Sequence, residues 1–510
     1  MYGGAAFGPA VIALPLTDQF ALPKLVVALV MSALLLALID PAFALRRWRA
    51  HPAPPVAALA LLTALALATL LADTRRQSVL GTYADYSGWL YYLPGIVAFG
   101  AAAALVRTPA ALDRLVSLLA IGAMPVLGYA VVQVADLDPV TWDIDFGRRA
   151  FSTLGQPLVL GGYAVTVLPM LSWLAVRRRG GERAFLLAEA ALAFAVLIAT
   201  GTRGAYIGAA AGTVTAIALV VAARGIPARA AVGAVIAMTA AAMLFAAAAA
   251  SGVLPERLRS TETLGERTDL WRGGIEMAAD RPVFGWGPDQ FATSYGPYRP
   301  SPERGAQSPY EAPAASPHNE TLQVALAGGG VALVAYAAMW LAVIAVAAIS
   351  IARHRLRGRR RAAVIALVAA LAGYLAQAQF SIPDPSLNVI AMMLLGALAG
   401  LVPARSGVLR VMPAPAARLL RCPARVVAGA LAATAVALVA ADYASTRGID
   451  AGPSESALSD ARRARAINPL QARYEDELAA LHNASRRWGV PPEEARGNAL
   501  ATYDRRIDRF

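Results

Sequence analysis

Apolar runs of membrane-span length recur along nearly the whole chain, and they constrain its fold more than any other feature. Crossing ~30 Å of hydrocarbon takes about 20 apolar residues in a helix. Inside a bilayer only helices and closed barrels satisfy every backbone hydrogen bond, so runs of this length are helices. The sequence therefore predicts an all-α integral membrane protein with about twelve transmembrane helices. The predicted spans are Leu25–Phe43, Val56–Leu71, Trp89–Val106, Leu115–Val134, Leu158–Val176, Ala184–Thr200, Ala205–Ala223, Ala230–Ala250, Thr321–Ile349, Ala362–Phe380, Leu387–Val402 and Val426–Ala441.

The N-terminal stretch Ala5–Leu16 is apolar but short, and it carries Pro9 and Pro15. It is interpreted either as a thirteenth span or as a re-entrant segment. Residues Met1 to Leu16 also lack the basic start and the small-residue cleavage site of a secretory signal, so no cleaved leader is expected.

Most of the positive charge falls in the loops of one side. The formal net charge is +13, and arginines cluster at positions 46–49, 177–179, 353–361 and 405–425. Short cytoplasmic loops carry an excess of Lys and Arg, so we assign this side to the cytoplasm. The charge is then explained by topology, and no nucleic-acid partner is expected. The single cysteine, Cys422, excludes an internal disulfide and a cysteine-based metal site.

One long polar segment, Ser251–Glu320, interrupts the apolar runs on the opposite side, which is the periplasm if there is an outer membrane. Most connections are far shorter, so we predict that this loop is the working part of an enzyme and that the rest of residues 1–443 forms the membrane domain holding it. Residues 444–510 are predicted to form a small periplasmic tail that resembles a tetratricopeptide-type helical pair. Its expected apolar positions are Ala461, Ala464, Ala466, Tyr474, Leu478 and Leu481, with a break at Asn468-Pro469.

The predicted spans are almost free of ionisable residues. Ion-coupled transporters usually hold acids or bases within the membrane, because these groups carry the ion or the proton. Polar groups gather instead at the outer surface of this chain. The pattern favours chemistry at the boundary between membrane and periplasm over transport through the bilayer.

His318 leads the candidates for that chemistry. It precedes a predicted helix that Ser316 would cap and Pro317 would open. Free histidine titrates near pH 6.5, so it accepts a proton at neutral pH. The alternative is a histidine used for loop packing or interfacial anchoring, and the sequence leaves both interpretations open.

Arg203 lies in a tight turn between two apolar helices, on the same outer side. Gly201 and Gly204 flank it and would let another group approach the backbone closely. An arginine suits a diphosphate, because this polyanion accepts paired hydrogen-bond donors. The alternative is an arginine that extends its side chain to lipid headgroups.

Arg267 opens a second candidate element, the predicted helix Glu266–Ala279. At ~100° per residue, Arg267 shares a face with Trp271 and Gly274. Arg272 lies on another face, so the two arginines are not expected to hold the same group.

Weaker candidates complete the set. Asp143 and Asp145 form a DxD pair that could hold a divalent metal, and Asp384 is a further acid in an outer turn, but no metal or other cofactor is expected. A secondary group is predicted to contact the diphosphate or the acceptor, and it consists of Trp271, Arg272, Arg281, Asn319 and Glu320.

Three motifs in this order carry a resemblance to a known family. They are Gly201-Thr202-Arg203-Gly204-Ala205, then Arg267 to Arg272 running into Asp280 to Phe291, then His318-Asn319-Glu320-Thr321-Leu322-Gln323 before a glycine-containing helix. Across residues 200–349 the chain resembles the O-antigen ligase / O-antigen polymerase family of bacterial membrane glycosyltransferases. One departure is Arg272, which stands where the family usually has a lysine.

The resemblance implies a glycan donor linked to undecaprenyl diphosphate and a metal-independent, inverting transfer at the periplasmic face of the inner membrane. It implies that His318 activates the acceptor hydroxyl and that Arg203 and Arg267 bind the diphosphate. The favoured reaction is ligation of O-antigen to lipid A core. Polymerisation of a polysaccharide and glycosylation of a protein remain open, as do two roles of another class, a polysaccharide or lipid exporter and a non-catalytic scaffold.

Overall fold

The computed structural model describes residues 2–48, 52–83, 85–142, 146–147, 149–224, 262–299, 315–402, 420–485 and 490–507. All regular secondary structure in these residues is helical, which confirms the predicted all-α class. Eight helices are long and apolar enough to cross a membrane. They are α2 (Ala21–Leu38), α4 (Ala53–Leu71), α7 (Pro109–Val134), α8 (Pro157–Arg177), α10 (Arg203–Arg224), α15 (Glu320–Ala352), α16 (Gly358–Ala378) and α19 (Arg421–Asp450).

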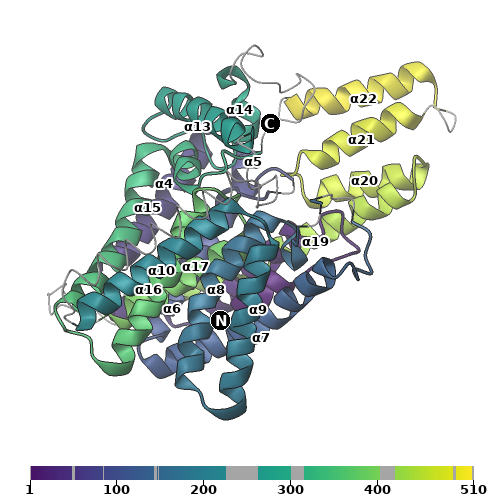
Figure 1. The fold of residues 1–510 in the computed structure, drawn as a ribbon. Coiled ribbons are helices and arrows are strands. Elements are labelled where there is room, and N and C mark those ends of the chain that lie inside the picture. The colour runs from purple at the N-terminus through teal and green to yellow at the C-terminus, as the bar shows by residue number, and fades with distance from the viewer. Residues whose placement is uncertain are drawn as a thin grey trace.

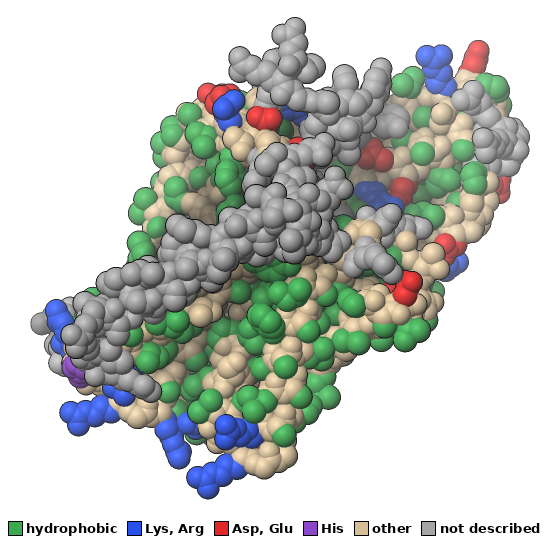
Figure 2. Space-filling model, in the orientation of Figure 1, with side chains coloured by type: hydrophobic (Ala, Val, Ile, Leu, Met, Phe, Trp, Pro, Cys, Tyr) green, Lys and Arg blue, Asp and Glu red, His purple; other side chains and the backbone are tan. Residues whose placement is uncertain are grey.

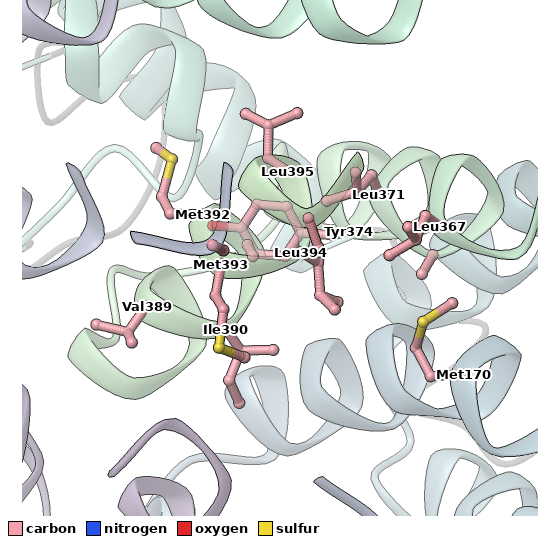
Figure 3. Close-up of a cluster of buried hydrophobic side chains, with 14 of the residues drawn as sticks. Met170, Leu367, Leu371, Tyr374, Val389, Ile390, Met392, Met393, Leu394 and Leu395 are labelled. Atoms are coloured by element: carbon pink, nitrogen blue, oxygen red, sulfur yellow. The ribbon is translucent and has the colours of Figure 1, made fainter. Parts of the chain in front are cut away.

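The predicted number of about twelve spans is not reached among these residues, and two helices explain part of the difference. α6 (Trp89–Leu105) and α17 (Pro385–Leu401) are apolar but have only 17 residues each, about 26 Å at 1.5 Å per residue. They pack along one another, and almost every side chain of α17 is buried. Figure 3 shows the α17 cluster of Met392, Met393, Leu394 and Leu395 beside Tyr374 of α16. Helices enclosed by protein in this way need not match the full thickness of the bilayer.

The remaining difference lies in two predicted spans. α9 (Gly180–Ala199) forms where expected, but it carries Glu182, Arg183 and Glu189, which is more charge than a plain membrane span tolerates. Residues 230–250 lie outside the described part of the chain. Glu189 also qualifies the expectation of nearly ion-free spans, since it is 5% exposed and neither of its carboxylate oxygens has a hydrogen-bond partner among the described residues.

α2 begins four residues before the predicted span, so it includes Lys24. This lysine lies in the first turn of α2 and is 1% exposed. Its ammonium group donates to the Phe20 carbonyl oxygen (2.7 Å) and lies over the Phe20 ring. Burial is tolerated because the long side chain reaches back past the helix start, where the ammonium group finds an acceptor in the Phe20 carbonyl oxygen and an aromatic face in the Phe20 ring.

The helices form a bundle with a polar cap at one end. α10 packs on α16, α15 on α4 and α8 on α9. The short helix α5 (Arg75–Leu80), α13 (Glu262–Asp280) and α14 (Phe291–Ser294) gather at the upper end in Figure 1, on the same side as the tail. Figure 2 shows the acidic side chains in view at the upper end and on the right, together with some Lys and Arg, whereas the charged side chains in view at the lower end are Lys and Arg.

A broken helix anchors this cap to the bundle. Gly328 and Gly329 depart from helical geometry inside α15, so the backbone donors after the break are left without helical partners. The turn 282–287 supplies partners on both sides of the break. After the break, the amide of Gly330 donates to the Pro282 carbonyl (2.7 Å), and before it, the Leu326 carbonyl accepts from the amide of Trp286 (2.8 Å). The Pro282-to-Gly287 motif is thus a docking turn, and it fixes the end of α13 on α15.

The tail consists of α20 (Glu455–Ile467), α21 (Arg473–Ala484) and α22 (Pro492–Ile507). The break predicted at Asn468-Pro469 is confirmed, since α20 ends at Ile467. Of the predicted apolar positions, Ala461, Ala464, Tyr474 and Leu478 are buried, whereas Ala466 is exposed and Leu481 is only half-buried. The predicted boundary between residues 443 and 444 falls inside the continuous helix α19, so the division into domains remains a prediction.

Asp442, near the end of α19, ties the tail to the rest of the molecule. It is fully buried, and its carboxylate accepts hydrogen bonds from the backbone amide of Thr17 (2.9 Å), the Tyr83 hydroxyl (2.7 Å) and the Tyr474 hydroxyl (3.3 Å). The Arg473 guanidinium lies 4.1 Å from the centre of the Tyr83 ring. We call this set of contacts the Asp442 clasp; it joins the N-terminal segment, the loop after α5 and the tail.

Candidate functional site

His318 lies just before α15 in an unusual backbone conformation. The residue that caps the helix is Asn319, whose side-chain oxygen accepts from the Leu322 amide (2.9 Å), so the predicted cap by Ser316 is wrong. His318 itself has φ +51°, a conformation that non-glycine residues seldom adopt and that is worth examining where it occurs. Its Nδ1 atom is buried without a hydrogen-bond partner in the part of the chain that the structure describes.

α13 presents Arg267 on the face that the sequence predicts. On this face the Trp271 indole N–H donates to the carbonyl oxygen of Pro317 (3.0 Å). Gly274 lies so close to the start of α15 that an added Cβ would stand 2.9 Å from the Leu322 side chain. Arg272 is exposed. The face shared by Arg267, Trp271 and Gly274 therefore packs toward the His318 segment.

Arg203 reaches the same region from α10, of which it is the first residue. The next residue, Gly204, touches Phe380: an added Cβ would lie 2.7 Å from the Phe380 Cβ. The Phe380 ring in turn contacts the Trp271 ring, with centroids 5.8 Å apart. A continuous series of contacts thus leads from the start of α10 through Phe380 and Trp271 to the residue before His318.

The charges of the three groups act on one another. Burial, followed by the nearby Arg203 charge, lowers the pKa of the Arg267 guanidinium from its usual range. Burial, followed by the nearby Arg267 charge, lowers the pKa of His318 to about 4. The imidazole is therefore neutral at pH 7 and free to accept a proton. Arg267 acts on the imidazole and Arg203 acts on Arg267, so two positive charges gather where an anion would be stabilised.

The residues predicted to contact the diphosphate or the acceptor lie in different surroundings. The Arg281 guanidinium forms an ion pair with Asp73 (2.8 Å) and lies 3.9 Å from the Trp286 ring centre, an arrangement that favours an anchoring role. Asn319 is the helix cap. Glu320 instead lines a small cavity between α6, α15, α16 and α17.

The other acids have no metal-binding arrangement in the described residues. Asp384 caps α17 by accepting from the Leu387 amide (2.9 Å) and from the Ser386 hydroxyl (2.6 Å). Asp143 and Asp145 lie outside the described residues. The ranges that are described contain no group of three His, Cys, Asp or Glu side chains placed to hold a metal ion.

Sequence reasoning missed a buried polar contact that positions the α13 segment. Asp289 is 1% exposed, has φ +57° and accepts from the Thr82 amide (2.6 Å) and the Thr82 hydroxyl (3.0 Å). Gln290 beside it donates to the Ser78 hydroxyl (3.0 Å). Burial raises the pKa of Asp289 to about 6. The signal was present in the sequence, as a polar Asp-Gln pair directly after the glycine-rich turn with no local partner.

The fold and the site together define an all-helical, multi-pass membrane protein with a basic, histidine-containing site at its polar end. Residues 188–337 match the family model described as O-antigen ligase, and Arg203, Arg267 and His318 all fall within that match. The match covers less than half of the chain, and over residues 188–337 it confirms the resemblance to the O-antigen ligase family. A comparison with curated proteins gives no significant match.

Proposed function

We propose that the protein transfers a glycan from an undecaprenyl-diphosphate carrier to an acceptor hydroxyl. The observation that carries the proposal is the packing of the Arg267 face of α13 against the His318 segment, with the Arg203 charge acting on Arg267, inside residues that match the O-antigen ligase family model. A neutral base and a site for a polyanion are the two requirements of this reaction when no nucleotide takes part.

In the proposed mechanism, His318 accepts the proton of the acceptor hydroxyl as its oxygen attacks the anomeric carbon of the donor sugar. The bond between that carbon and the diphosphate oxygen breaks, and the diphosphate leaves with the electron pair, still attached to the polyprenyl chain. Direct displacement of this kind inverts the anomeric configuration. Arg203 and Arg267 bind the diphosphate and stabilise the charge that grows on it, a role that metal ions fill in many phosphate sites.

The favoured reaction is ligation of O-antigen to lipid A core. It would take place at the periplasmic face of a bacterial inner membrane, because the arginine-dense loops are assigned to the cytoplasm. Polymerisation of an O-antigen-type polysaccharide and glycosylation of a protein hydroxyl use the same chemistry with another acceptor.

The test is a transfer assay with lipid-diphosphate glycan in membranes, with lipid A core, free glycan and a protein offered as acceptors and a chelator present. We expect H318A and R267A to abolish transfer while both variants still insert in the membrane. R463A, which changes an exposed arginine of the tail, is the matched control and should transfer normally. Normal transfer by H318A and R267A would remove the mechanism, and sensitivity to the chelator would restore a role for Asp143 and Asp145.

A further inference from the structure

A cavity lies two residues along the chain from His318, and the proposed mechanism leaves it without a role. It is enclosed by Glu320 at the start of α15, Tyr91 of α6, Tyr374 and Gln377 of α16, and Ser381 and Asp384 in the turn before α17. Four different parts of the chain therefore contribute to one small polar space. Its volume is about 10 Å³, which is the room that one water molecule needs, ~10–15 Å³.

The lining is polar beyond what packing requires. The Ser381 hydroxyl is buried and has no partner among the described residues. The Glu320 carboxylate is close enough to the phenol groups of Tyr91 and Tyr374 for its charge to act on both, and no hydrogen bond to it comes from the part of the chain that the structure describes. Buried polar groups without partners are costly. The arrangement is explained if a bound ligand supplies the missing hydrogen bonds.

An ordinary structural role does not account for Glu320. A glutamate in the first turn of a helix stabilises the helix dipole, and it does so from an exposed position. Glu320 instead faces a cavity walled by two tyrosines, and the helix end is already capped by Asn319.

The chemistry of the lining limits what the cavity takes. A carboxylate only accepts hydrogen bonds, so its partner must be a donor. A second carboxylate, Asp384, lies in the same wall, and two carboxylates repel a phosphate or any other anion. The volume excludes a whole sugar ring. A neutral hydroxyl group, which donates to Glu320 and exchanges hydrogen bonds with Ser381 and the tyrosines, satisfies all three conditions.

We propose that this cavity is a hydroxyl subsite, in which Glu320 and Ser381 bind one hydroxyl group of the acceptor sugar and displace a water. The inference rests on the proposed glycan transfer. It assigns the two ends of the reaction to surfaces of opposite charge: the arginines hold the diphosphate of the donor, and the acidic cavity holds a hydroxyl neighbouring the one that reacts. Glu320 is a specificity-determining residue in this arrangement, because an acceptor without that hydroxyl leaves a half-buried carboxylate unpaired.

The experiment uses the full-length protein purified in detergent, with lipid-diphosphate glycan as donor and lipid A core as acceptor. Wild type, E320Q, E320A and S381A are compared with E276Q, a control that changes an exposed glutamate of α13. We expect E320Q and E320A to raise the KM for the acceptor about 10-fold or more, S381A to raise it severalfold, and all three to leave the KM for the donor unchanged. Thermal unfolding of each variant separates this effect from loss of the fold.

A panel of acceptors that each lack one hydroxyl provides the decisive comparison. For the analogue without the bound hydroxyl, wild type and E320Q should have the same KM. Equal values of acceptor KM for wild type and both Glu320 variants, or a fall in kcat alone, would overturn the subsite. The H318A variant keeps the two proposals distinguishable, since active H318A contradicts the transfer mechanism, whereas inactive H318A with unaffected E320Q contradicts only the subsite.

Discussion

The surroundings of His318 keep its imidazole neutral at pH values well below those at which histidine usually becomes protonated. Burial and the Arg267 charge lower its pKa to about 4. We therefore predict that kcat/KM for transfer rises as pH increases through about 4 and then stays level to pH 7, because the neutral imidazole is the reactive form. A diphosphate bound between the arginines offsets the charge of Arg267, so the pKa of His318 is higher in the donor complex. The increase of kcat with pH should therefore be centred at a higher pH than the increase of kcat/KM.

The measurement is a pH–rate profile taken with thermal stability followed in parallel. The parallel measurement is needed because the unfolded imidazole binds its proton near pH 6.5, before the folded one does. The folded protein thus loses stability as pH falls from about 6.5 to about 4, and H318Q should lose less. A rise in kcat/KM centred at pH 6.5 or above would contradict a buried, neutral base.

At the residue scale, periodicity predicted which side chains share a face of a helix. It did not predict which of them form ion pairs or hydrogen bonds with distant residues. The 3.6-residue repeat placed Arg267, Trp271 and Gly274 on one face of α13, and that face does pack toward His318. The ion pair between Arg281 and Asp73 joins residues far apart in the chain, and no local pattern indicates such a pairing. Asn319 replaced Ser316 as the cap because the chain turns at His318 before the helix begins.

At the scale of elements, the break in α15 depends on one glycine. Gly329 has φ +64° and ψ −163°, a region that is essentially restricted to glycine, and an added Cβ would collide with the Val283 backbone. We predict that G329A lowers the thermal unfolding midpoint and reduces transfer, since strain of about 1–3 kcal/mol is added and the turn 282–287 is displaced.

G128A is the matched control, because Gly128 also lies in a long apolar helix and an added Cβ would meet nothing within 4 Å. It should match the wild-type midpoint or exceed it, since alanine is the better helix former. A G329A variant as stable as G128A would show that the break is not needed to seat the turn.

Hydropathy located the helices well because each apolar run is long and bounded by loops. Hydropathy reads each run alone, whereas burial by neighbouring helices also decides how long a helix must be, so the exact number of spans stays a prediction. α6 and α17 are short because they line each other in the interior. The two-glycine break in α15 was not predicted, since Gly-rich helices are also common in membranes without a break.

On the scale of the whole molecule, the orientation in the membrane is the prediction that the sequence supports best and that most needs a direct test. Cys422 is exposed at the start of α19 and is the only cysteine in the chain. We predict that a membrane-impermeant maleimide labels it only after the inner membrane is permeabilised, because this end carries the arginine-dense loops. The double variant C422S/S454C moves the thiol to the tail and should be labelled in intact spheroplasts; the reverse pattern would invert the topology.

The Asp442 clasp predicts how the tail is held. We expect D442A to make the tail helices α20–α22 sensitive to limited proteolysis, because Thr17, Tyr83 and Tyr474 lose a shared, fully buried acceptor. The control is D450N, which changes an exposed aspartate at the end of the same helix. Equal rates of tail cleavage in D442A and D450N would mean that other contacts hold the tail.

The clasp also bears on the order of biogenesis. It joins Thr17 to Asp442, residues separated by 425 positions, so a ribosome must release almost the entire polypeptide before the N-terminal segment finds its partner. Insertion of the early helices would then precede final closure by the time needed to translate the rest. Chains that stop short of the tail would contain Asp442 but lack Tyr474, so the clasp closes fully only once the tail has been made.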